Sequence, residues 1–211
     1  MSRKVVRLSL DVLTDLVPPC GTCAVWEAPV GRSGLTDEEA SSEKETWVST
    51  VLREWGACGR VVYVDGEPAG HVLYAPGLLV PGADRFLAGP PSGDAALVTS
   101  LRVAEPYRGG GLGRLLVQAV VKDMLKRPGI RAIECFGGPG GASCQVPTEF
   151  LLHVGFKTKR HHPVAPLMRM ELRSVVSWRT EFEQALEKLR GVVVPTPAPR
   201  PAAETRHPRL P

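Results

Sequence analysis

Six residues, Arg108-Gly-Gly-Gly-Leu-Gly113, join a segment with strand character to a segment with helical spacing. The first N–H groups of a helix have no partner inside the helix, and the helix dipole adds partial positive charge there. Glycines let the backbone approach an anion with no side chain in between. The chain must therefore provide a strand, a sharp turn and a helix in that order, and the turn is a predicted phosphate site.

The flanking segments support this order. Residues 95–103 are rich in β-forming residues and predict a buried strand that ends at Glu105-Pro106. Residues 112–127 have helical spacing, and Pro128-Gly129 then stops the helix. Residues 130–136 predict the next strand. A strand–helix–strand crossover of this kind joins two parallel strands.

The segment 103–114 resembles the acetyl-CoA signature of the GNAT superfamily of N-acetyltransferases. The family pattern is Gln/Arg-x-x-Gly-x-Gly/Ala, and three residues fill it: Arg108, Gly111 and Gly113. The resemblance covers residues 60–172. It implies an α/β (α+β) fold with a mixed, splayed central sheet flanked by helices.

Two different glycine motifs fit the sequence less well. A dinucleotide fingerprint needs a third glycine where this chain has Arg114. A nucleotide phosphate loop needs Gly-Lys-Ser/Thr, which the sequence lacks. An ordinary tight turn between strand and helix is the remaining alternative.

The resemblance implies acetyl-CoA as co-substrate, with its pyrophosphate on the turn and its pantetheine arm beside the preceding strand. A primary amine, from a small molecule or a protein, would attack the thioester directly, and a backbone N–H near Val103 would stabilise the oxyanion. The implied cofactor contacts are Leu101, Arg102, Val103, Arg108, Gly109, Gly110, Gly111, Leu112, Gly113, Arg114 and Ser143.

Catalytic groups are less clear in the sequence. Glu134, on the strand after the signature, matches a position where some family members carry a glutamate base, and a salt-bridged strand glutamate is the alternative. The usual acid of the family is a tyrosine, and Leu151 stands at its position. Tyr74, Cys144, His153 or water could replace it. A non-catalytic acyl-CoA-binding regulatory module is therefore a second hypothesis.

The cysteines give a third hypothesis. Cys20 and Cys23 have the spacing of a metal or redox motif, and a zinc or redox interaction protein could be built on them. Cys135 and Cys144 could complete a zinc site only if the fold brought them close. We expect buried thiols near the substrate cleft instead and assign no metal ligand.

The acceptor side of the molecule is only outlined by the sequence. Trp26, Trp47 and Tyr74 could frame an amine, or they could be core residues. Glu27 could bind an amine, but we expect it to be a surface glutamate. Elsewhere, residues 5–12 predict a first strand, Thr36–Glu39 a capping box that starts a helix, and Asp65-Gly66 a hairpin turn.

Composition narrows the function classes. The formal charge of +4 is partly in the C-terminal tail, so we expect no nucleic-acid partner. No apolar run is long enough for a membrane span, and the unevenly placed cysteines favour a cytoplasmic protein. We expect an acetyltransferase domain over residues 1–173, a C-terminal helix at 174–190 and a disordered proline-rich tail at 191–211. A homodimer is left open.

Overall fold

A mixed sheet runs through the part of the chain that the structure describes, with strand order β1-β2-β3-β4-β5-β8-β7 and with β6 paired to β5 off this path. The strands are β1 (Arg3–Arg7), β2 (Gly59–Val64), β3 (Glu67–Pro76), β4 (Ala95–Val103), β5 (Ala132–Gly138), β6 (Val146–Pro147), β7 (Lys157–Arg160) and β8 (Leu167–Glu171). The α-helices are α1 (Asp37–Trp55), α2 (Leu112–Met124) and α3 (Thr148–His153). Short 3-10 turns are η1 (Leu10–Asp15), η2 (Cys20–Thr22), η3 (Gly77–Leu79), η4 (Pro81–Arg85) and η5 (Glu105–Tyr107).

The computed structural model describes residues 2–32, 34–139 and 144–173. They belong to one structural unit, Met1–Val175. The predicted C-terminal helix at 174–190, the predicted tail at 191–211 and the predicted cofactor contact Ser143 lie outside the described residues.

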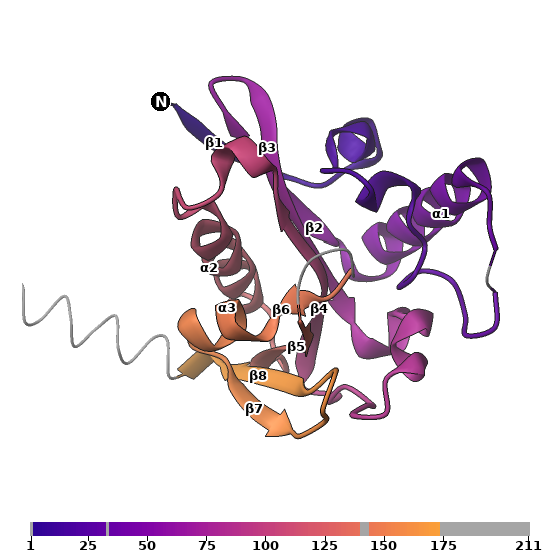
Figure 1. Ribbon diagram of the computed structural model, residues 1–211, viewed down its shortest axis with the longest axis vertical. Helices are drawn as coiled ribbons and strands as arrows, with labels where there is room; N and C mark the ends of the chain where they lie inside the picture. The colour runs from indigo at the N-terminus through magenta and orange to yellow at the C-terminus, as the bar shows by residue number, and fades with distance from the viewer. Residues whose placement is uncertain (1, 33, 140–143, 174–211) are drawn as a thin grey trace, which may run out of the picture. The chain divides into compact units, whose positions relative to one another are not determined.

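Two buried clusters hold the sheet between its helices. Figure 1 shows α2 on one side of the β2–β3–β4 part of the sheet and α1 on the other. On the α2 side, Val72, Tyr74 and Leu116 are almost fully buried. On the α1 side, Leu73 and Val51 are buried in the second cluster. Successive residues of β3 thus face opposite clusters, as expected for a strand that is covered on both faces.

Local sequence signals place the elements around this core. The capping box of α1 is confirmed, because the Thr36 hydroxyl accepts from the Glu39 N–H and the Glu39 carboxylate accepts from the Thr36 N–H. The hairpin turn is confirmed as well, with φ of 50° at Asp65 and 95° at Gly66. The predicted strand at residues 5–12 is wrong in its second half. β1 ends at Arg7, and η1 follows because it buries Leu13 against the α1 side of the sheet.

The sheet opens between β4 and β5. The two strands are parallel, as the crossover predicted, and they pair from Ala95–Ala132 to Val98–Cys135. Beyond that pair, β5 turns to β6 and pairs with it at Gly137–Val146. No described strand pairs with this side of β4 after Val98. The resulting splay lies directly before the glycine turn.

A β-bulge in β4 accompanies this opening. On β3, Leu73 pairs with Ser100 while its neighbour Tyr74 pairs with Val98. Thr99 is therefore an extra residue without its own partner on β3.

Candidate functional site

The glycines of the turn are needed for two different reasons. Gly109 and Gly111 have φ of +75° and +80°, a backbone conformation that residues with a side chain rarely adopt. Gly113, inside α2, is needed for space, because a Cβ there would lie 3.0 Å from ring atoms of Phe150. Two residues of the turn thus have left-handed backbone conformations, and the start of α2 packs closely against α3.

The N-terminus of α2 faces this bend without a side-chain cap. Gly111 is the N-cap residue and no side chain accepts from the first turn of the helix. The first internal backbone bond runs from the Leu115 N–H to the Gly111 carbonyl. The N–H groups ahead of Leu115 are therefore available to an anion, in the positive end of the helix dipole.

Two arginines stand beside this terminus. The Arg108 Nε–H donates to the carbonyl of Val103 at 3.2 Å, which ties the bend to the end of β4. An Arg114 terminal nitrogen lies 3.2 Å from His153 Nε2 on α3. Both arginines are exposed, so the surface around the backbone N–H groups is positively charged.

The predicted pantetheine contacts lie on the unpaired edge of β4. Leu101 and Val103 pack on the α2 side, whereas Arg102 lies opposite His71 of β3. The hydroxyls of Thr99 and Ser100 are buried and have no partner among the described residues. The structure therefore brings residues 101–103 and 108–114 together at one corner of the sheet.

Glu134 is buried in β5 and fully engaged by its neighbours. Its carboxylate accepts from Ser92 N–H at 2.8 Å and Oγ at 2.6 Å, from Lys159 Nζ at 2.8 Å and from Arg169 at 2.9 Å. Burial acts to raise the pKa of Glu134, but the hydrogen bonds from Lys159, Ser92 and Arg169 outweigh it, so the pKa lies below its ordinary value. The ion pairs of the salt-bridge alternative are present. The base role stays a prediction.

The acid candidates are scattered over the fold. Tyr74 faces the α2 side, where its hydroxyl donates to Asp123 at 2.6 Å. Leu151, at the position of the usual tyrosine, is buried in the same cluster. His153 is exposed beside Arg114, next to the glycine turn. Cys144 lies on the other face of the sheet, in contact with the α1-side cluster.

The α1 side of the sheet holds a buried polar group that the sequence did not reveal. Lys44 Nζ and Glu27 Oε1 form an ion pair with side chains only 4% and 0% exposed. The expectation of a surface glutamate is therefore wrong for Glu27. Trp26 and Trp47 are buried, which confirms their core alternative. The helical stripe Ala40, Lys44, Trp47, Val51 places the lysine on the apolar face of α1, and this was the signal that could have found the pair.

His71 is buried beside this pair. Its Nδ1 accepts from the Val17 N–H at 3.0 Å, so the ring proton sits on Nε2, which has no partner among the described residues. Burial, helped by the charges of Lys44 and Arg102, lowers the pKa of His71 to about 3. The ring is therefore neutral at physiological pH and presents a buried N–H donor.

Cys23, one of the two cysteines of the CxxC spacing, meets a cysteine that is distant in the sequence. Cys23 lies against Cys144, with 2.9 Å between the two sulfurs, while Cys135 is buried on the α2 side. Within residues 2–32, 34–139 and 144–173, no three His, Cys, Asp or Glu side chains are grouped as they would be around a metal ion.

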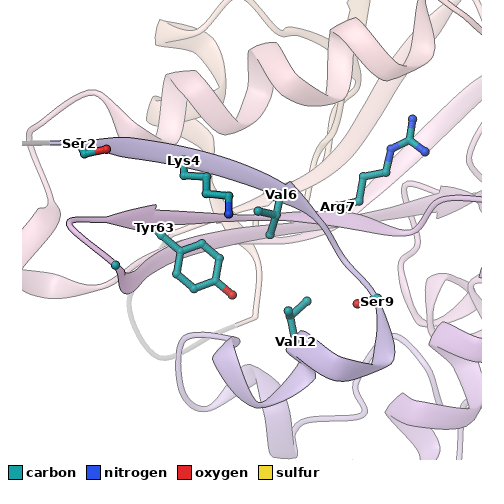
Figure 2. Close-up of a pocket in the computed structure, with 8 residues that line it drawn as sticks. Ser2, Lys4, Val6, Arg7, Ser9, Val12 and Tyr63 are labelled. Atoms are coloured by element: carbon teal, nitrogen blue, oxygen red, sulfur yellow. The ribbon is translucent and has the colours of Figure 1, made fainter.

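A groove of about 560 Å³ lies elsewhere, along the edge strand β1. Figure 2 shows Tyr63 between the β1–β2 pair and the turn that carries Val12. The groove is lined by Ser2, Lys4, Val6, Arg7, Ser9, Val12, Tyr63 and Gly66. None of these is a predicted site residue. Among the described helices, none has the length and apolar character needed to cross a membrane.

Solved structures share this architecture. An aminoglycoside acetyltransferase, AAC(6')-Ib, crystallised with coenzyme A, covers 84% of this chain and 99% of its own, with TM-score 0.57 and 16% identity. PaiA N-acetyltransferase from Thermoplasma acidophilum, also with coenzyme A, covers 81% and 99%, with TM-score 0.51 and 14% identity. The GphF GNAT-like decarboxylase with isobutyryl-CoA covers 80% and 99%, with TM-score 0.52 and 19% identity. These likenesses establish the fold.

The family follows from the sequence itself. The pattern of the acetyltransferase (GNAT) family matches residues 25–141, which is more than half of the chain and includes β4, the glycine turn and α2. No curated protein matches the sequence. The splayed sheet and the glycine turn agree with this match, and the chain belongs to the GNAT acetyltransferase family.

Proposed function

We propose that this protein is an acetyl-CoA-dependent N-acetyltransferase that transfers an acetyl group to a primary amine. The observation that carries the proposal is the uncapped N-terminus of α2, where Gly109 and Gly111 expose backbone N–H groups next to an unpaired strand edge. The pyrophosphate of acetyl-CoA would bind these N–H groups, and the pantetheine arm would lie along residues 101–103. That coenzyme A is bound by AAC(6')-Ib and PaiA supports this assignment.

Acetyl transfer requires few groups besides the backbone that would bind acetyl-CoA. In this proposal the thioester would reach the α1 side of the sheet through the splay, and the amine would attack its carbonyl there. A backbone N–H near Val103 would stabilise the oxyanion of the tetrahedral intermediate, typically worth about 3 kcal/mol. The coenzyme A thiol then leaves. Glu134 as the base stays part of the proposal, although a carboxylate with a lowered pKa is a weak proton acceptor at neutral pH.

The cofactor site can be tested with two matched glycines, one that caps the start of α2 and one in the connection between α2 and β5. Gly111 and Gly129 have φ of +80° and +85°, and neither has an atom within 4 Å of an added Cβ. Glutamate at either position imposes the same backbone strain and the same charge. We expect calorimetry to show that Gly111→Glu loses acetyl-CoA binding while Gly129→Glu retains it. Equal affinity in the two variants would remove the turn from the site.

The reaction can be tested separately. Release of free thiol from acetyl-CoA should be followed over a panel of aminoglycosides, polyamines and peptides with a free N-terminus. We expect thiol release with at least one class of amine. Tight binding of acetyl-CoA without release over the whole panel would favour the regulatory module, which the buried Leu151 at the usual acid position permits.

A further inference from the structure

Two half-exposed thiols lie in contact although 121 residues separate them in the chain. Cys23 follows η2, and Cys144 comes shortly before β6. Their sulfur atoms are 2.9 Å apart, and both are free thiols in this structure. The other three cysteines, Cys20, Cys58 and Cys135, are buried.

The pKa values of the two thiols are shifted in opposite directions. The hydrogen bond with Cys144 and the nearby charge of Lys44 lower the pKa of Cys23 to about 6, against the opposing effect of burial. The same hydrogen bond raises the pKa of Cys144. Cys23 is therefore the thiol of the pair that loses its proton more readily. One nucleophilic sulfur beside one protonated sulfur is the arrangement of a redox-active cysteine pair.

We propose that Cys23 and Cys144 form a reversible disulfide when the protein meets a peroxide. The Cys23 thiol first gives its proton to solvent. The thiolate attacks one peroxide oxygen, the O–O bond breaks, and the departing hydroxide takes up a proton from solvent to become water. The sulfur of Cys144 then attacks the Cys23 sulfenic acid. The S–O bond breaks, the S–S bond forms, and the Cys144 proton leaves with the hydroxide as a second water. Two thiols are oxidised to one disulfide and the peroxide is reduced to two waters.

The disulfide would join two segments that lie near the opening between β4 and β5. Gln145, the neighbour of Cys144, donates to the carbonyl of Gly137 at the end of β5, on one side of the opening. The charge of Arg102, on the β4 side, acts on Cys144 as well. Cys23 lies in the segment that leads to Trp26 and Glu27 on the α1 side. Oxidation thus ties this N-terminal segment covalently to the β5 end of the opening.

The test uses the full-length protein treated with hydrogen peroxide and then analysed without reductant. We expect intact mass to fall by two hydrogen atoms, peptide mapping to find a Cys23–Cys144 cross-link, and dithiothreitol to restore the free thiols. Because the bond closes a long loop, we also expect the melting temperature to rise by several degrees. Cys23→Ser and Cys144→Ser should each abolish the cross-link, and Cys20→Ser should retain it.

Three results would overturn the proposal. A cross-link between Cys20 and Cys23 would show that the CxxC pair is the redox site. Oxidation of Cys23 to sulfinic acid with Cys144 still alkylatable would show that no disulfide forms. Zinc that copurifies with the chain and protects both thiols from alkylation would show a metal site. Peptide mapping of the alkylated, unmutated chain together with metal analysis of the intact protein distinguishes all three, so the outcome does not depend on how the variants fold.

Discussion

The hydroxyl of Tyr74 donates to the carboxylate of Asp123 across the α2 side of the sheet, with 2.6 Å between the two oxygens. Arg60 of β2 donates to the same carboxylate, with 2.8 Å from its Nε to Oδ2. Burial and the hydrogen bond to Asp123 raise the pKa of Tyr74 above its ordinary value. The Asp123 carboxylate thus links β2, β3 and α2, and the Tyr74 hydroxyl is one of the donors that hold these elements together.

Tyr74→Phe should therefore reduce stability and leave turnover intact. Loss of a buried hydrogen bond to a charged group costs about 1.5–3 kcal/mol. Urea unfolding measures this loss directly. Tyr63→Phe is a matched control, because its hydroxyl bonds to Asp15 at a half-buried position and should cost less. A large drop in kcat for Tyr74→Phe with unchanged stability would instead place the tyrosine in the reaction.

Glu134→Gln separates the two roles of this residue. The amide keeps the shape but removes the charge that pairs with Lys159 and Arg169, so we expect a loss of about 2 kcal/mol in the free energy of unfolding. If Glu134 is the proposed base, Glu134→Gln should also lower kcat by about 100-fold and remove the acidic limb of the pH–rate profile. A variant that loses stability but keeps both kcat and that limb would leave Glu134 with the salt-bridge role alone.

His71 should make the fold sensitive to mild acid. Its pKa is about 3 in the folded protein and about 6.5 in an unfolded chain, so the unfolded state binds more protons between these values. Stability must then fall as the pH falls through this window, by roughly 2 kcal/mol from pH 6.5 to pH 5. Denaturant unfolding at several pH values measures this slope. His71→Gln should flatten it, whereas replacement of the exposed His153 should not.

The buried pair Glu27–Lys44 is suited to a double-mutant cycle. Lys44→Met leaves the Glu27 carboxylate buried and uncompensated, which should cost about 3–5 kcal/mol. Adding Glu27→Gln removes that charge and should recover a large part of the loss. Chemical unfolding of the two single variants and the double variant gives the coupling energy. Additive losses would mean that the two side chains contribute independently.

Sequence reasoning worked best where one short segment determines its own geometry. The capping box at Thr36, the hairpin at Asp65 and the bend at Gly111 each depend on neighbouring residues, and all three are present. The parallel pairing of the two strands around α2 followed from the length and character of the crossover. These predictions needed no knowledge of distant contacts.

The failures share a different origin. Cys23 meets Cys144, and Glu27 meets Lys44, only after distant segments have packed together. The stripe on α1 places Lys44 on the apolar face, but it does not identify Glu27 as the partner, and no local pattern predicts the contact between the two cysteines. The first strand was predicted too long because Leu10 and Val12 have strand character on their own, while burial of Leu13 favours a 3-10 turn. Long-range packing decided each of these cases.

The extra residue in β4, Thr99, determines which face of the sheet each later side chain of the strand occupies. Up to Val98, even-numbered residues of this strand face α2, and after Thr99 the parity is reversed, so that Arg102 shares the α1 side with Ser100. Deleting a single residue here would rotate every later side chain by half a turn and push the guanidinium into the apolar interior. A single deletion would therefore exchange the side chains that the end of β4 presents to the two faces of the sheet, whereas a substitution would leave the two faces as they are.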